Sequence, residues 1–200
     1  SDAVFPSLAA KEGDSVLDVG CGFGDTAIRL ARAVGPTGRV VGIDCCEAFM
    51  DYGREAAKAE GLENISFRAG DALVEPFEPE FDFVFARFGT MFFSNPVVGL
   101  RNMRTALKPG GLMTHIVWRR RDDNPWLGMA KDIVLRFLPP PGEDAQTCGP
   151  GPFSMADEDM VRMMMKGAGY EDITFERVDA PVLVGRSVDD AIAFQLAIGP

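Results

Sequence analysis

The stretch VLDVGCGFGD, residues 16–25, decides the fold that this sequence predicts. Its apolar first half is typical of a buried strand, and Gly20, Gly22 and Gly24 are typical of a tight turn that opens a helix. Such a turn presents backbone N–H groups and the positive end of a helix to a ligand. The stretch therefore predicts a strand, a ligand-binding turn and a helix in direct succession.

The alternation of strand and helix continues through the first half of the chain. Strands that alternate with helices form parallel units with right-handed crossovers. The expected fold class is therefore α/β, a doubly wound, mostly parallel sheet with helices on both faces and the ligand at the carboxyl ends of the strands. Strands are expected at 15–20, 38–44, 64–72 (a strand with its exit loop), 81–89 and 112–118, and helices at 25–34, 46–61 and 95–111.

The alternation stops after residue 118, and residues 120–169 are interpreted as a helical and loop insertion near the ligand site. No shift in composition marks a linker, so residues 1–200 are expected to form a single domain. Both ends of the sequence are abrupt, and we expect this domain to be truncated at one or both of them. The pattern predicts a helix at 124–138, a loop at 139–153, a helix at 154–169 with Ser154 as N-cap, a strand-like stretch at 170–185 and a helix at 187–198.

Composition and charge narrow the classes of partner. The chain has 200 residues, of which 46% are hydrophobic and 25% charged, an ordinary balance for a folded domain. A formal net charge of −10 makes it a poor partner for nucleic-acid phosphates or anionic membranes, and no apolar stretch is long enough to cross a bilayer. The four cysteines form no Cys-x-x-Cys pair, which indicates a reduced, cytoplasmic protein. With one histidine, no metal site is expected.

Two carboxylates distinguish this turn from a dinucleotide site. Dinucleotide-binding turns follow the pattern G-x-G-x-x-G, and the third glycine position falls here on Asp25. Asp25 at the helix start and Asp18 at the strand end would both repel a pyrophosphate. A ligand with a cation and no phosphate, such as S-adenosylmethionine, fits both features better. An NAD-dependent oxidoreductase remains the less favoured alternative.

The stretch VLDVGCGFG resembles the first motif of class I S-adenosylmethionine-dependent methyltransferases, and the resemblance extends over about residues 13–119. Within that family the chain is similar to the bacterial group around the ubiquinone and menaquinone C-methyltransferases. The resemblance implies a Rossmann-like methyltransferase fold, S-adenosylmethionine as cofactor and in-line transfer of a methyl group to a small organic acceptor. A non-catalytic module that binds S-adenosylmethionine stays open as the alternative.

The resemblance also implies cofactor-binding residues at the ends of the first four strands. Asp18 would orient the amino group, Asp44 would accept from the ribose hydroxyls, and Asp71 would accept from the adenine amino group. Asp44 as a helix N-cap and Asp71 as a turn-forming residue are the structural alternatives. The expected set is Asp18, Gly20, Cys21, Gly22, Gly24, Asp44, Cys45, Met50, Gly70, Asp71, Ala72, Arg87 and Phe88, with Phe49 beside Met50.

The substrate side of the expected site is aromatic and offers no convincing base. Arg87 could bind a substrate carboxylate or phenolate, or it could pair with a structural acid. His115 is interpreted as a hydrogen-bonded core residue rather than a catalyst. The fourth strand leads into ARFG instead of the Asn- or Asp-Pro-Pro-aromatic box of nucleobase methyltransferases, which argues against a nucleic-acid substrate. Residues that could form an apolar pocket, or simply core, are Phe88, Met91, Phe92, Trp118, Trp126 and Phe153.

Overall fold

The computed structural model of the protein describes residues 2–125, 133, 135–139, 150–183 and 185–198. The chain divides into two compact units, one made of Ser1–Leu8 with Thr174–Pro200 and the other of Ala9–Ile173. The larger unit contains the sheet and the whole expected cofactor set. The single domain over residues 1–200 therefore stays a prediction. No helix of the described residues is long and apolar enough to cross a membrane.

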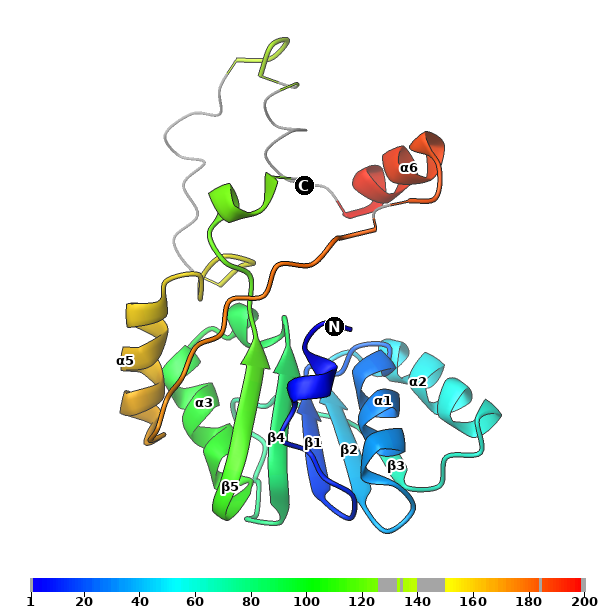
Figure 1. The fold of residues 1–200 in the computed structure, drawn as a ribbon, viewed down its shortest axis with the longest axis vertical. Coiled ribbons are helices and arrows are strands. Elements are labelled where there is room, and N and C mark those ends of the chain that lie inside the picture. Colours follow the sequence, from blue (N-terminus) through cyan, green and yellow to red (C-terminus); the bar gives the residue numbers. More distant parts are fainter. Residues whose placement is uncertain (1, 126–132, 134, 140–149, 184, 199–200) are drawn as a thin grey trace. The chain divides into compact units, whose positions relative to one another are not determined.

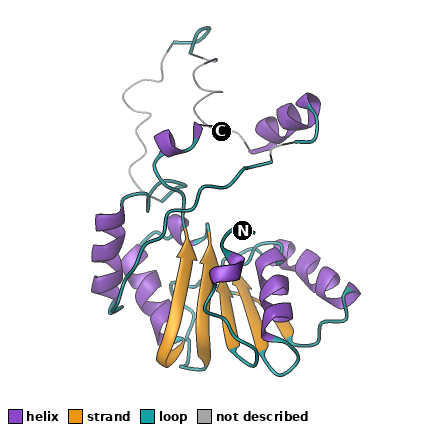
Figure 2. Ribbon diagram, in the orientation of Figure 1, coloured by secondary structure: helices purple, strands orange, loops and turns teal. Residues whose placement is uncertain are grey.

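A sheet of five parallel strands forms the centre of the larger unit (Figures 1 and 2). Its strand order is β3-β2-β1-β4-β5. The order reverses between β1 and β4, so the crevice where such folds bind ligands lies at the carboxyl ends of these two strands. The expected fold class is confirmed. The strands are β1 (Ser15–Val19), β2 (Arg39–Asp44), β3 (Ile65–Ala69), β4 (Phe81–Arg87) and β5 (Leu107–Ile116).

The two central strands, β1 and β4, supply the core. Their sequences, SVLDV and FDFVFAR, are almost continuously apolar, as expected of strands covered by helices. Val16, Leu17, Phe83 and Phe85 are at most 1% exposed. Burying a side chain of this size stabilises a fold by about 1.5–3 kcal/mol. The core therefore fixes the strand ends that carry the expected site.

Helices pack beside the sheet on the side of β2 and β3 and on the side of β5. The helices α1 and α2 lie beside β2 and β3, and α3 packs with α5 beside β5 (Figure 1). Their starts and ends follow the sequence signals in the first half, where α1 ends at the predicted residue and α2 within two residues of it. The smaller unit holds α6, close to the range expected for the last helix. The bounds are α1 (Asp25–Val34), α2 (Glu47–Ala59), α3 (Pro96–Thr105), α5 (Glu158–Ala168) and α6 (Val188–Ile198), with short 3-10 turns at Phe5–Ser7, Thr90–Phe92 and Arg121–Asp123.

The helix expected at 95–111 is too long. It ends at Thr105, and Leu107 already pairs with Phe81 in the sheet. The next pair, Leu112 with Phe83, is out of step with the first, so the intervening KPGG segment forms an irregularity in β5. The sequence pattern could not reveal this, because the register depends on the partner strand.

Two further predictions in the second half are wrong. Ser154 is not the N-cap of the helix expected at 154–169. That helix is α5, capped by the Asp157 carboxylate, which accepts from the Met160 N–H at 3.1 Å. The Ser154 hydroxyl donates instead to the Met91 carbonyl oxygen at 2.6 Å. The stretch 170–185 contains no strand among its described residues, although its alternation of apolar and polar side chains predicts one.

Other expectations for the second half lie mainly outside the described residues. Most of the helix at 124–138, including Trp126, falls there, as do residues 140–149 of the expected loop. The insertion at 120–169 therefore stays a prediction.

Candidate active site

The glycine turn between β1 and α1 is attached to the end of β2. The N–H groups of Gly20 and Cys21 both donate to the Ile43 carbonyl oxygen, at 2.8 and 3.1 Å. The Gly24 N–H closes the turn on the Cys21 carbonyl oxygen at 2.9 Å. These bonds involve backbone groups alone, and they hold the turn against the end of β2. Cys21 is buried, in keeping with a backbone role.

The three glycines of the turn share one backbone requirement and differ in what surrounds them. All have positive φ, at 70°, 53° and 85°, a region that other residues rarely adopt. A Cβ on Gly20 would lie 3.2 Å from the Gly89 Cα, and one on Gly24 would lie 2.9 Å from the Phe67 ring. A Cβ on Gly22 would meet no heavy atom within 4 Å. Gly22 is therefore the point of the turn where a ligand can approach the backbone.

The Asp44 carboxylate connects the glycine turn to the start of α2. Its Oδ2 accepts from the Gly22 N–H at 2.9 Å, and its Oδ1 accepts from the Cys46 N–H at 2.9 Å. The N-cap of α2 is Cys46, so the N-cap interpretation of Asp44 is wrong. Each carboxylate oxygen has a second lone pair, so Asp44 can still accept from ligand hydroxyls. Cys45, the next residue, is exposed.

Asp18 is a fully buried carboxyl at the end of β1. Its Oδ2 accepts from the Thr26 hydroxyl at 2.6 Å, whereas its Oδ1 is buried and has no hydrogen-bond partner among the described residues. Burial raises the pKa of Asp18 to about 7. The Thr26 hydrogen bond and the charge of Arg87 act against this rise, and the charge of Asp44 adds to it. Asp18 thus has one oxygen, Oδ1, that can still accept a hydrogen bond from a ligand.

Asp71 forms the turn after β3. Its Oδ1 accepts from the Leu73 N–H at 2.9 Å, which agrees with the turn-forming interpretation. Gly70 connects this turn to the site, because its N–H donates to the Asp44 carbonyl oxygen at 3.0 Å. Ala72 is buried. Asp71 itself is exposed, so its carboxylate can meet a ligand as well as hold the turn.

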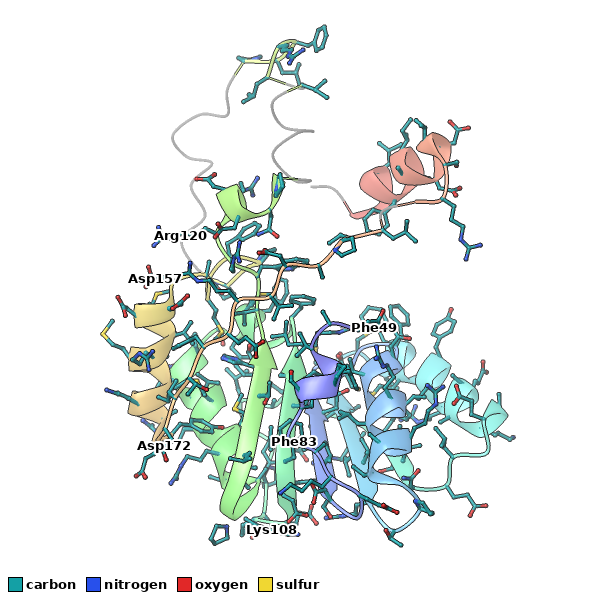
Figure 3. The ribbon with its side chains drawn as sticks, in the orientation of Figure 1. Phe49, Phe83, Lys108, Arg120, Asp157 and Asp172 are labelled. Carbon is teal, nitrogen blue, oxygen red and sulfur yellow. The ribbon has the colours of Figure 1, made fainter. Side chains whose placement is uncertain are left out.

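Apolar side chains gather where α2 begins, near the glycine turn (Figure 3). Met50 is fully buried in the core, whereas Phe49 is 40% exposed. The Phe49 ring packs against the Phe23 ring of the turn, with 4.6 Å between centroids, and the Tyr52 ring contacts Phe23 as well, at 5.5 Å. Phe49 is therefore better placed than Met50 to contact a ligand in this conformation. The sequence analysis did not single out Phe23, although it lies between two glycines of the turn.

Strand β4 leaves the sheet through a strained residue. Phe88 has a φ of 58°, which is uncommon for any residue except glycine. Its N–H donates to the Ile116 carbonyl oxygen at 2.8 Å, and its ring stacks on Trp118, with 4.4 Å between centroids and 8° between planes. The structure thus brings together two of the expected pocket residues, from the carboxyl ends of neighbouring strands.

The other expected pocket residues differ in how far they are buried and in what they contact. Met91 is core, and its carbonyl oxygen accepts from the Gly151 N–H at 3.0 Å as well as from Ser154. Phe92 is 57% exposed. Phe153 lies under the guanidinium of Arg121, which is 5.2 Å from the ring centroid. Among the expected pocket residues, Phe88 and Trp118 are therefore the pair whose stacked rings form a common aromatic surface.

His115 and the acids of the chain offer little for acid–base or metal chemistry. The His115 Nδ1 lies 3.2 Å from the Thr90 hydroxyl, and burial lowers the pKa of the ring to about 4. A base this weak is poorly matched to proton abstraction at neutral pH. Among the described residues, no group of three or more His, Cys, Asp or Glu side chains could hold a metal ion.

The residues present fit S-adenosylmethionine. A buried carboxylate oxygen without a donor suits an ammonium group, the open side of Gly22 admits close approach to the backbone, and the exposed carboxylate of Asp71 suits an amino group. These features lie at the carboxyl ends of β1 and β3, the two strands on either side of β2. The donor and acceptor pattern therefore matches a cationic nucleoside better than a pyrophosphate.

Comparison with known proteins gives the family. Residues 16–111 match the family model described as the methyltransferase domain. The demethylmenaquinone methyltransferase of Staphylococcus carnosus is 31% identical over 179 residues, which cover 85% of this chain and 73% of that protein. The demethylmenaquinone methyltransferase of Staphylococcus aureus strain JH9 is 41% identical over 111 residues, 55% of this chain and 45% of that protein.

Solved structures share the fold. A SAM-dependent methyltransferase from Aquifex aeolicus superposes with a TM-score of 0.63 at 25% identity, over 84% of this chain and 78% of that one. Phosphoethanolamine N-methyltransferase 2 of Haemonchus contortus, solved with S-adenosyl-L-methionine, gives a TM-score of 0.60 at 18% identity, over 86% and 36% of the two chains. The second likeness concerns the fold alone.

The chain belongs to the class I S-adenosylmethionine-dependent methyltransferases, in the group of menaquinone C-methyltransferase type. Its cofactor is S-adenosylmethionine, which supplies a methyl group already activated on a sulfonium. This membership sets aside the NAD-dependent alternative.

Proposed function

We propose that this chain methylates a small, planar organic acceptor bound beside the stacked rings of Phe88 and Trp118. The observation that carries the proposal is this stack, placed at the carboxyl ends of β4 and β5 next to the glycine turn. Flat aromatic surfaces bind flat ligands through offset stacking and burial of apolar area. The relatives named demethylmenaquinone methyltransferases support an aromatic acceptor of quinol type.

The cofactor side of the proposal assigns one part of the ligand to each strand end. The α-amino group goes to Asp18, the ribose hydroxyls to Asp44, and the adenine amino group to Asp71. Gly22 admits the methionyl part at the open point of the turn that Gly20 and Gly24 keep closely packed, and Cys45 and Phe49 line the adenine, with Met50 in the core beneath them. The remaining expected residues, Cys21, Gly70, Ala72, Arg87 and Phe88, form the walls. Support comes from the orphan Oδ1 of Asp18 and the open face of Gly22.

The chain has to position the acceptor and exclude water, because the methyl group arrives activated. A general base is needed only if the acceptor must lose a proton. The low pKa of His115 argues against that residue as the base. Arg87 could stabilise an ionised acceptor such as a phenolate, since guanidinium groups bind oxyanions well.

We also propose that the protein acts in the cytoplasm on small molecules and not on nucleic acid. The net charge of −10 opposes binding to phosphate backbones. Cys21, Cys45 and Cys46 are free thiols, as expected in a reducing compartment.

A turnover assay tests the proposed function. The chain is incubated with S-adenosylmethionine and a panel of hydroxylated aromatic compounds, including a short-chain demethylmenaquinol, and S-adenosylhomocysteine is measured. We expect formation that depends on the acceptor, and a loss of about tenfold or more in kcat/KM for Trp118→Leu without a change in S-adenosylhomocysteine affinity. Met163→Ala, an exposed site on α5, is the matched control.

Two results would count against this function. If the cofactor binds but no acceptor yields product, the non-catalytic binding module becomes the better description. If Trp118→Leu and the control variant behave alike, the aromatic stack does not bind the acceptor.

A further inference from the structure

Thr26 is a buried polar residue that the cofactor set does not include. It is the second residue of α1 and is 3% exposed. A buried hydroxyl needs a hydrogen-bond partner, and Thr26 has one in Asp18, across the glycine turn. At 2.6 Å the Oγ1–Oδ2 distance is typical of a hydroxyl donating to a carboxylate.

This hydrogen bond leaves the two oxygens of Asp18 unequal. Oδ2 is engaged by Thr26, whereas Oδ1 is buried without a partner among the described residues. A carboxyl held at one oxygen cannot rotate freely, so Thr26 fixes the direction in which the other oxygen is presented. A buried acceptor without a donor is costly, and a ligand that brings a donor removes that cost.

Two charged side chains and one thiol, each from a different element, act on Asp18 or face it. Arg87 at the end of β4 favours the ionised carboxylate, whereas Asp44 at the end of β2 disfavours it. Cys21 of the glycine turn faces the same group, since the charge of Asp18 helps to raise the pKa of that thiol. Arg87 and Asp44 thus act on the ionisation of Asp18 in opposite directions, and the Thr26 hydroxyl, hydrogen-bonded at 2.6 Å, favours the ionised form.

We propose that Thr26 is a positioning residue for the cofactor, whose hydroxyl holds Asp18 so that Oδ1 accepts from the α-ammonium group, directly or through one water. This inference rests on the proposed function, which assigns the amino group to Asp18. Thr26 itself does not touch the ligand. Its effect on binding therefore depends on whether the ligand carries an ammonium group.

Two ligands that differ in this group give the test. S-adenosylhomocysteine carries the amino acid part, and 5′-methylthioadenosine lacks it. Both are titrated calorimetrically into wild type, Thr26→Val and Thr26→Ser. We expect Thr26→Val to lose about tenfold or more in affinity for S-adenosylhomocysteine and to bind 5′-methylthioadenosine as wild type does. Thr26→Ser keeps the hydroxyl and should restore most of the loss.

The pH profile adds a readout that a purely structural role would not move. In wild type, affinity for S-adenosylhomocysteine should rise between about pH 6 and pH 8 as Asp18 ionises. In Thr26→Val the same rise should occur at higher pH, because the hydrogen bond that favours ionisation is gone. If Thr26→Val does not fold, Thr26→Ala removes the hydroxyl without putting a methyl group in its place and is titrated in the same way.

Three results would overturn the inference. Equal loss for both ligands would make Thr26 a structural residue only. An unchanged pH profile in the variant would show that Thr26 does not act through Asp18. Binding of neither ligand to wild type would overturn the proposed function itself, which is thereby distinguished from failure of the Thr26 inference alone.

Discussion

At the scale of single residues, the chain keeps an ionisable group where an apolar one would pack more easily. Asp18 stands in a strand whose neighbours Val16 and Leu17 are fully buried. Its carboxyl lacks one hydrogen-bond partner, and its pKa is raised mainly by burial. A group of this kind costs stability in the free protein, and such costs are typical of binding sites.

This leads to a prediction for Asp18→Asn. Since the pKa of Asp18 is about 7 in the folded chain and 3.8 in the reference state, the folded chain binds more protons between these values. Stability should therefore fall as pH rises from about 4 to 7, by at most about 4 kcal/mol. Urea unfolding of the ligand-free chain measures this slope.

The Asn variant should lack that slope and should be more stable than wild type at about pH 8, while losing about tenfold or more in affinity for S-adenosylhomocysteine. A variant that is less stable than wild type at this pH would contradict the claim that the buried, partly unpaired carboxyl of Asp18 lowers the stability of the ligand-free protein.

At the scale of elements, the glycine turn is the place where β1, α1, α2 and β3 meet. Gly24 packs against Gly53 of α2 and the Phe67 ring of β3, whereas Gly22 faces open space. The two glycines share a positive φ and differ in their surroundings. Gly24 therefore allows the close packing of these elements, and Gly22 allows a ligand to approach the backbone.

Alanine substitutions should separate these roles. The left-handed backbone should destabilise both variants by about 1 kcal/mol. Gly24→Ala is destabilised further, because its Cβ would lie 2.9 Å from the Gly53 Cα, a backbone atom that cannot move aside as a side chain can. We expect Gly24→Ala to be less stable than Gly22→Ala in urea unfolding. Relative to its loss of stability, Gly22→Ala should lose more cofactor affinity than Gly24→Ala does. Equal profiles for the two variants would contradict this division.

The elements also show what the sequence could and could not predict. Periodicity located β1, α1 and β2 because their patterns are local and end at glycines or aspartates. The β5 irregularity and the hydrogen bond from Ser154 to Met91 depend on partners far along the chain. The Asp157 cap is local, because its acceptor lies three residues before Met160, and the sequence analysis chose Ser154 in its place.

The site followed the same rule. The acids at strand ends could be predicted from the strand pattern together with the family resemblance. The hydrogen bonds that the Gly22 N–H donates to Asp44 and the Thr26 hydroxyl donates to Asp18 depend on side-chain conformation, which neither of these fixes.

At the scale of the whole molecule, the account depends on one ligand class. All the acids, glycines and aromatic residues of the site lie within Ala9–Ile173, the unit built on the parallel sheet. The same fold class serves dinucleotides in other proteins, with a glycine where this chain has Asp25. The central claim is therefore that this crevice binds a cationic nucleoside and rejects a pyrophosphate.

Calorimetric titration of the wild-type chain with S-adenosylhomocysteine, and in parallel with NADH, tests that claim most directly. The account predicts binding of S-adenosylhomocysteine with a Kd of roughly micromolar order, about −8 kcal/mol, and no measurable binding of NADH. Binding of NADH with equal or higher affinity, or the absence of S-adenosylhomocysteine binding, would contradict it.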